Sequence, residues 1–160
     1  LVYYVQKLVP LLLNVCSKTN MKRLKEGSKL LVLDTYALLN VLFKETGHER
    51  VVNYLQKAKQ GRLTLLLNEI NLGECFYRIW KRDGENEAKT GLVHITHLPL
   101  TFVPVDQAFI LAAASWKGQY AISYADAFVV ETAARNKCPI LTGDPEFEAI
   151  SEVEIIRVGK

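Results

Sequence analysis

The sequence predicts a single α/β domain with a mainly parallel central sheet and helices on both faces. Short, continuous apolar runs alternate along the chain with longer segments of helical periodicity, which is the pattern of buried parallel strands connected by helices. A length of 160 residues suits one domain with a substantial core. Because 49% of residues are apolar and only three are cysteines, a disordered chain and a disulfide scaffold are excluded.

The first half of the chain contains two predicted strands, each followed by helical segments. Leu30 to Leu33 is a continuous apolar run, and helical spacing begins just beyond it. His48 to Gln60 is helical and stops at Gly61, a residue suited to the end of a helix. Leu63 to Leu67 is the second strand, and Asn68 is placed to cap the next helix.

That next helix is expected to run to about residues 83 and 84 and to bury one apolar stripe. The stripe consists of Ile70, Cys75, Phe76, Ile79 and Trp80. A further helical stretch follows near Glu85 to Thr96.

The second half continues the same alternation with shorter strands, and prolines and glycines mark the boundaries. The predicted elements are a strand from Leu100 to Val105, a helix capped by Asp106 and ended by Gly118, a helix from Ser123 to Asn136, a strand from Pro139 to Thr142, a helical turn from Pro145 to Ile150 and a strand from Val153 to Val158.

The net charge of +3 is carried by the start of the chain. Residues 1 to 29 hold six basic side chains and one acidic one, whereas the rest holds fourteen basic and sixteen acidic. Because Met21 is the only methionine and opens a typical domain start, residues 1–20 are predicted to be an N-terminal extension, appended or not native, and residues 21–160 the domain. The apolar part of the extension is too short and too interrupted to span a membrane. Three distant cysteines without a C-x-x-C pair suggest a reducing, cytoplasmic setting.

Four acidic residues lie where ligands bind in parallel α/β sheets, beyond the carboxyl ends of the strands. Asp34 follows the first strand, Glu74 lies two turns into the helix after the second, Asp126 lies in the first turn of its helix, and Asp144 follows a strand after one glycine. Each has an ordinary alternative: a turn for Asp34, a capping box for Asp126, a helix cap for Asp144 and solvation for Glu74. Together they suggest a cation site, since unpaired carboxylates are costly to bury. Ligation by oxygen alone selects Mg²⁺ or Mn²⁺.

The four acidic segments resemble the motifs of PIN-domain ribonucleases, and most of all those of VapC toxins. The segments are Leu-Val-Leu-Asp34-Thr-Tyr-Ala-Leu-Leu, Leu67-Asn-Glu-Ile-Asn-Leu-Gly-Glu74, Tyr124-Ala-Asp126-Ala-Phe-Val-Val-Glu-Thr-Ala and Ile140-Leu-Thr-Gly-Asp144-Pro-Glu-Phe147. The resemblance covers residues 30 to about 158. It departs from many relatives at Tyr36, where they carry Asn or Ser two residues after the first Asp.

The resemblance implies a PIN-like nuclease domain that hydrolyses RNA phosphodiester bonds with Mg²⁺ or Mn²⁺, acting as the toxin of a type II toxin–antitoxin pair. It implies that Asp34, Glu74, Asp126 and Asp144 hold the metal and form the catalytic site. A small antitoxin protein and a homodimer are the partners it implies. Thr142 and Asn68 are candidate hydrogen-bond donors around the acids, with helix capping as the competing role of Asn68.

One basic patch is a weak candidate for binding RNA. It consists of Arg78, Lys81 and Arg82 on the helix that carries Glu74. A solvated helix face is the alternative for these three, and Trp80 beside them is expected in the core. A non-catalytic interaction module with the same fold, and a solitary RNA-processing nuclease, are the alternative functions. A phosphoacceptor domain and an Asp-x-Asp phosphatase are disfavoured because Thr35 and Tyr36 follow Asp34, and a dinucleotide-binding fold because no Gly-rich turn does.

Overall fold

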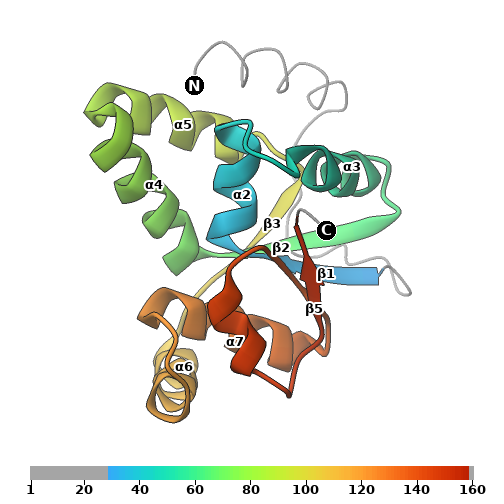
Figure 1. Cartoon of the computed structure of the whole chain (residues 1–160), viewed down its shortest axis with the longest axis vertical. Helices are drawn as coiled ribbons and strands as arrows, with labels where there is room; N and C mark the ends of the chain where they lie inside the picture. Colours follow the sequence, from blue (N-terminus) through green and yellow to red (C-terminus); the bar gives the residue numbers. More distant parts are fainter. Residues whose placement is uncertain (1–28, 159–160) are drawn as a thin grey trace.

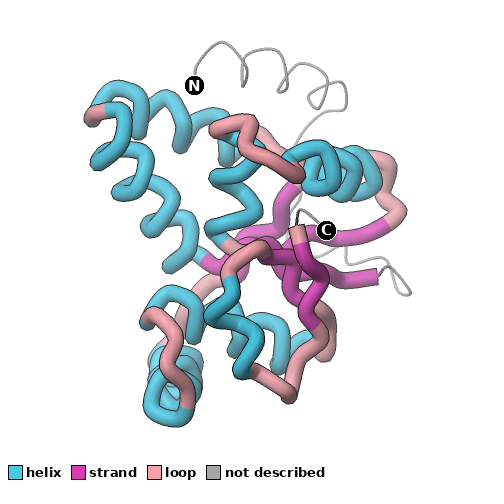
Figure 2. Tube along the Cα trace, viewed as in Figure 1, coloured by secondary structure: helices cyan, strands magenta, loops and turns pink. Residues whose placement is uncertain are grey.

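Five parallel strands form the middle layer of a three-layer α/β arrangement in the computed structural model, which describes residues 29–158 (Figures 1 and 2). The strands are β1 (Lys29–Leu33), β2 (Leu63–Asn68), β3 (Leu100–Val103), β4 (Ile140–Thr142) and β5 (Ile155–Arg157). Their order in the sheet is β3-β2-β1-β4-β5. The predicted fold class is therefore confirmed. The predicted extension at residues 1–20 and its boundary at residue 21 lie outside the described residues.

Six α-helices and one 3₁₀ helix connect the strands. They are α2 (Thr35–Leu42), α3 (His48–Lys59), α4 (Glu69–Asp83), α5 (Glu85–Thr96), α6 (Gln107–Gln119), α7 (Tyr124–Asn136) and η1 (Pro145–Ala149). Helices α2 to α5 lie on one side of the sheet and α6 and α7 on the other (Figure 1). No helix among the described residues combines the length and the hydrophobicity that crossing a membrane would require.

The central strand β1 is paired on both sides. Val32 is in register with Leu66 of β2 and with Ile140 of β4. The chain therefore leaves β1 in one direction to build β2 and β3, and later returns to its other side with β4 and β5. Such a switch point opens a crevice at the carboxyl ends of the strands, where ligands of open α/β sheets bind.

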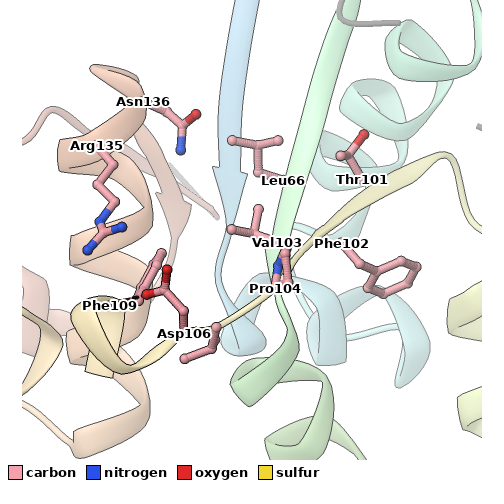
Figure 3. A pocket seen from close by; sticks show the side chains of 10 residues that line it. Leu66, Thr101, Phe102, Val103, Pro104, Asp106, Phe109, Arg135 and Asn136 are labelled. Atoms are coloured by element: carbon pink, nitrogen blue, oxygen red, sulfur yellow. Dashed lines mark hydrogen bonds between the residues drawn. The ribbon is translucent and has the colours of Figure 1, made fainter. Parts of the chain in front are cut away.

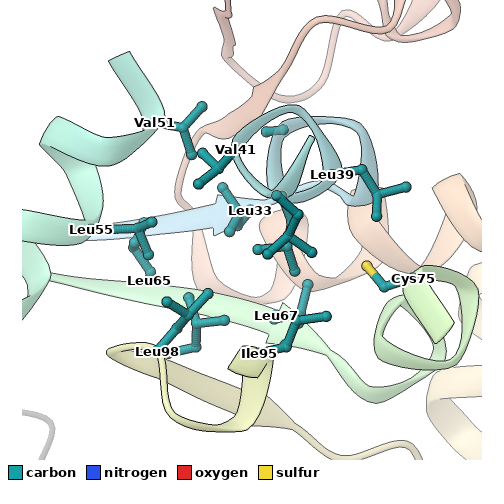
Figure 4. Close-up of a cluster of buried hydrophobic side chains, with 14 of the residues drawn as sticks. Leu33, Leu39, Val41, Val51, Leu55, Leu65, Leu67, Cys75, Ile95 and Leu98 are labelled. Carbon is teal, nitrogen blue, oxygen red and sulfur yellow. The ribbon is translucent and has the colours of Figure 1, made fainter. Parts of the chain in front are cut away.

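Alternate side chains of the strands supply two separate cores, because successive residues of a strand point to opposite faces. Leu33, Leu65 and Leu67 pack against α2 to α5 in the larger cluster (Figure 4). Val32 and Leu66 pack on the other face, against α6 and α7. Burial on both faces explains why these strands are continuous apolar runs in the sequence.

Local capping signals start the helices at the carboxyl edge as predicted. The Asn68 side chain accepts a hydrogen bond from the Ile70 amide at 2.9 Å, and Ser123 and Asp126 form a reciprocal capping box. Asp144 accepts from the Glu146 amide at 2.9 Å, directly before the proline that opens η1.

The predicted strands Leu100 to Val105 and Val153 to Val158 are shorter in the structure, where they span Leu100–Val103 and Ile155–Arg157. Two further details of the predicted elements are wrong. Helix α6 continues through Gly118 to Gln119, because an exposed glycine with a helical backbone weakens a helix without stopping it. On α4, Trp80 is 45% exposed and Ile70 39% exposed, so neither belongs to the buried stripe. The buried residues of that helix are Asn71, Glu74, Cys75 and Ile79. The buried face of α4 is thus narrower and more polar than its hydrophobic periodicity predicts.

Candidate functional site

Asp34 is the most deeply buried of the four predicted acids. It lies between β1 and α2 at the carboxyl edge of the sheet and is 1% exposed. The Thr142 hydroxyl donates to Asp34 Oδ2 at 2.6 Å, and the amide of Asp144 donates to the same hydroxyl at 2.9 Å. The other carboxylate oxygen, Oδ1, is buried without a hydrogen-bond partner among the described residues. Such an oxygen is costly to bury unless something further binds it.

Glu74 and Asp126 approach Asp34 from the two sides of the crevice. Glu74 comes from the second turn of α4 and Asp126 from the first turn of α7, and both side chains are buried. Helices α4 and α7 are in direct contact across the end of the sheet. The negative charges of both carboxylates act on Asp34 strongly enough to raise its pKa. Glu74 and Asp126 therefore lie near enough to Asp34, at the same edge of the sheet, for their charges to act on it.

The electrostatics of Asp34 follow from this setting. Its pKa is raised from an ordinary 3.8 to about 7, mainly by burial and to a smaller extent by the negative charges of Asp126 and Glu74. The hydrogen bond from Thr142 acts in the opposite direction by favouring the ionised form. A carboxylate that is protonated near neutral pH when alone becomes a ligand once a cation replaces its proton.

In EDTA, the protein should become less stable as the pH rises from about 4 to about 8. Asp34 titrates near 3.8 when unfolded and near 7 when folded, so the folded state binds more protons between these values. The stability that the bound proton contributes is present below about 4 and is lost as the pH passes about 7. Thermal unfolding at pH 5, 6, 7 and 8 measures this.

The Asp34→Asn variant is the control for that series, because it cannot titrate at this position. The melting temperature of the wild type relative to this variant should fall with rising pH, and added Mg²⁺ should reverse the fall at pH 8. A difference that stays constant from pH 5 to 8 would show that Asp34 does not hold its proton in the folded state.

Asp144 stands at the rim of the same edge. Its side chain caps η1, and its carbonyl accepts a hydrogen bond from Arg157 Nη1 at 2.6 Å. Within residues 29–158, no group of three or more carboxylate, imidazole or thiol side chains is arranged as a ready metal cage. The donor set is nevertheless all oxygen, and it includes Asp34 Oδ1, which has no hydrogen-bond partner within these residues, so the chemistry of the donors fits a hard divalent cation.

Asn71 is a residue of this site that sequence reasoning missed. It is fully buried, and its Nδ2 lies 3.2 Å from the Ala125 carbonyl, 3.3 Å from Thr35 Oγ1 and 3.5 Å from Glu74 Oε2. Its own Oδ1 has no partner among the described residues. The only sequence signal was its place three residues before Glu74, on the same face of the helix.

The predicted basic patch is occupied by contacts within the protein. Arg78 Nη1 lies 3.6 Å from Glu74 Oε1, and the Arg82 guanidinium lies 3.7 Å above the Phe43 ring. Lys81 Nζ lies 5.3 Å from the centre of the Tyr77 ring. Of the two other predicted neighbours, Thr142 binds Asp34 directly. Asn68 combines its cap with a hydrogen bond from Nδ2 to Thr132 Oγ1, at 3.2 Å.

A hollow of about 400 Å³ lies away from the acids, where α6 and α7 leave part of β2 and β3 uncovered (Figure 3). Leu66 and Val103 are among the residues that line it, with Phe109 and Arg135 from the two helices. The Arg135 guanidinium lies 4.4 Å from the centre of the Phe109 ring. None of the four acids lines this hollow, so it is separate from the crevice.

Comparison with known proteins gave one matching family and several solved structures of similar fold. A family model described as PIN domain matches residues 31–153. A solved structure of VapBC2 from Rickettsia felis, bound to a DNA fragment from its promoter, is 17% identical, covers 80% of this chain and 98% of that chain, and has a TM-score of 0.62.

Two further solved structures show the same likeness. VapC20 of Mycobacterium tuberculosis, described as a sarcin-ricin loop cleaving toxin, is 16% identical and covers 78% of this chain and 97% of that one, with a TM-score of 0.63. VapBC-1 of nontypeable Haemophilus influenzae is 15% identical and covers 82% and 99%, with a TM-score of 0.60. At these identities the likeness shows the fold. A comparison with curated proteins gave no match.

Proposed function

The chain belongs to the PIN-domain family, and from this premise we propose that it is a divalent-metal-dependent endoribonuclease. The observation that carries the proposal is the buried Asp34. Its Oδ1 has no hydrogen-bond partner among residues 29–158, and the charges of Asp126 and Glu74 raise its pKa. Buried carboxylates with strongly raised pKa values at the carboxyl edge of a parallel sheet are typical of functional sites rather than of structural ones. VapC20, with the same fold, is described as a sarcin-ricin loop cleaving toxin.

Asp34, Glu74, Asp126 and Asp144 are the proposed catalytic residues, and they would hold Mg²⁺ or Mn²⁺. The bound cation would supply a water of lowered pKa and neutralise charge on the phosphoryl oxygens. Thr142 fixes the orientation of Asp34 by donating to Oδ2, which leaves Oδ1 available to a cation. Asn71 connects Glu74 with Ala125 at the start of α7, and we propose that it thereby positions the Glu74 carboxylate relative to Asp126. Asn68 is proposed to act indirectly, by fixing the start of α4.

We further propose that the protein is the toxin of a toxin–antitoxin pair, bound by a small antitoxin and forming a homodimer. The structures of similar fold from R. felis and H. influenzae are both named as VapBC. A cytoplasmic location agrees with the thiols of Cys75 and Cys138, which are free and buried. Burial raises the pKa of both thiols, so they stay protonated.

Mixed RNA with Mg²⁺ should be cut by the wild type and at least about 100-fold more slowly by Asp126→Asn, since changing even an outer partner of a metal site costs about 10- to 100-fold. An Asn side chain can still accept a hydrogen bond from the Ser123 amide, so the capping box and the fold should be retained. EDTA should abolish cleavage, and Mg²⁺ or Mn²⁺ should restore it. Gel electrophoresis of RNA and thermal unfolding of both proteins measure these effects.

Two results would contradict the proposal. Equal cleavage by both proteins would show that Asp126 is not part of the reaction. Cleavage by neither, under several metals, would favour the alternative of a non-catalytic PIN-fold interaction module.

A further inference from the structure

Three of the four exposed aromatic side chains of the described region stand within three residues of a proposed catalytic acid in the sequence. Tyr36 is two residues after Asp34, Tyr77 is three after Glu74, and Tyr124 is two before Asp126. All three rings are exposed, although large aromatic side chains usually bury most of their surface. Trp80 on α4 is the fourth exposed ring, but it stands six residues after Glu74 and is not one of the three rings next to the acids in the sequence. Single-stranded nucleic acids bind to aromatic rings placed along a backbone path, because every base has a flat face that stacks.

Tyr36 is the ring whose position is most closely tied to the site. It lies in the first turn of α2, and its ring packs on the backbone of Gly143, between Thr142 and Asp144. A Cβ atom at position 143 would collide with the ring, so only glycine lets the ring lie here. Tyr36 thus stands at the rim of the crevice, in contact with the loop that carries two of the proposed site residues.

On its other side, Tyr36 faces a groove of about 290 Å³ between α2 and α4. The groove is lined by Tyr36, Leu39, Phe43, Glu45, Arg78 and Arg82. The groove thus presents two guanidinium groups and one carboxylate, and Arg82 Nη1 lies 3.7 Å from Glu45 Oε1 in an exposed ion pair that a phosphate can replace. Arg78 links the groove to the acids through its ion pair with Glu74.

We infer that Tyr36 holds one unpaired base of the RNA in this groove, beside the phosphate that is cut. The inference rests on the proposed nuclease function and makes Tyr36 a specificity-determining residue. An aromatic floor with cationic walls suits a base and its flanking phosphate, because the ring stacks on the base and guanidinium groups bind phosphate. The volume of the groove is at the lower end of the range for ligand pockets, so it can hold a single base but not a base-paired duplex. The substrate must therefore be unpaired at the site of cleavage.

The decisive experiment combines removal of the ring with removal of the base. Tyr36→Ala, Tyr36→Phe and wild type are compared on a short single-stranded RNA that the wild type cuts. The same RNA is also made abasic at the nucleotide on either side of the cut. Tyr36→Ala should raise KM about tenfold on the intact RNA, which is within the usual effect of removing one stacking ring. On the RNA that is abasic at the stacked position, wild type and Tyr36→Ala should have the same KM.

Two controls separate stacking from other roles. Tyr36→Phe keeps the ring and should stay within about twofold of wild type. Trp80→Ala removes an exposed ring of α4 that does not line the groove, and it should leave KM unchanged. Annealing a complementary strand to the RNA should block cleavage by the wild type.

Equal KM values for wild type and Tyr36→Ala on the intact RNA would overturn the inference. It would also be overturned if Tyr36→Ala raised KM by the same factor on every abasic RNA as on the intact RNA. Either result leaves the nuclease function standing, because the wild type still cleaves. An unchanged KM together with an altered oligomeric mass of Tyr36→Ala would assign the groove to a protein partner instead. Failure of the wild type to cut any RNA would reject the proposed function and this inference together.

Discussion

The Asp34→Asn variant is expected to lose RNA cleavage by about 1,000-fold or more and yet to unfold at a higher temperature than the wild type at pH 8. The loss is expected because the variant removes the central carboxylate of the proposed site, a larger change than removing an outer partner, which costs up to about 100-fold. The gain is expected because the buried Asp34, with a pKa of about 7, is ionised at pH 8 without a cation to balance it. Asparagine still accepts the hydrogen bond from Thr142 but carries no charge.

The size of the thermal effect distinguishes this explanation from ordinary mutational damage. Most substitutions of buried residues destabilise a protein, whereas this one should raise the melting temperature by about 3 °C or more in EDTA, corresponding to roughly 1 kcal/mol or more. Asp83→Asn, an exposed carboxyl at the end of α4 that pairs with Arg82, is the matched control and should change neither activity nor stability. A lower melting temperature for Asp34→Asn, or cleavage at the wild-type rate, would contradict the proposed role of Asp34.

Asn71→Ala is the second substitution with a large expected effect. It removes the side chain that connects Glu74 with α2 and α7, so cleavage should fall about 10- to 100-fold and the Mg²⁺ concentration for half-maximal rate should rise. The Ala125 carbonyl loses a buried donor, and stability should fall by about 1–3 kcal/mol. Rates measured across a Mg²⁺ series and urea unfolding report the two effects separately.

A merely structural role for Asn71 would lower stability without changing the Mg²⁺ requirement. Asn53→Ala, on the exposed side of α3, is the matched control for loss of an asparagine from a helix and should leave both quantities unchanged. If Asn71→Ala has the wild-type Mg²⁺ requirement at a temperature where it is fully folded, Asn71 does not position the metal-binding carboxylates.

The features that sequence predicted correctly are those that depend on neighbouring residues. The strands around Leu31 and Leu65 are continuous apolar runs because both their faces are covered, and that pattern needs no knowledge of what covers them. The capping box of Ser123 and Asp126 spans three residues, so it too is visible locally. The meeting of Asp34, Glu74 and Asp126 was predictable in outline, because parallel strands deliver their ends to one edge.

The errors and omissions arise where distant parts of the chain decide the outcome. Hydrophobic periodicity assigned Trp80 to the buried face of α4, but the neighbouring helices cover only the part of that face near Cys75 and Ile79. Asn71 is a polar residue whose partners Thr35 and Ala125 lie 36 and 54 residues away. Its importance follows from the packing of three helices, which no local pattern encodes.

The pairing of β1 with β4 also sets when activity can begin during synthesis. Thr142, which orients Asp34, stands 108 residues after Asp34 in the sequence and is therefore synthesised later. At synthesis rates of about 5–20 residues per second, Asp34 leaves the ribosome roughly 5–20 s before its partner. Until then β1 lacks the strand on one side, and neither Thr142 nor Asp144 is present. Under the proposed function, a growing chain therefore cannot cut the messenger RNA or ribosomal RNA around it until residue 144 has emerged.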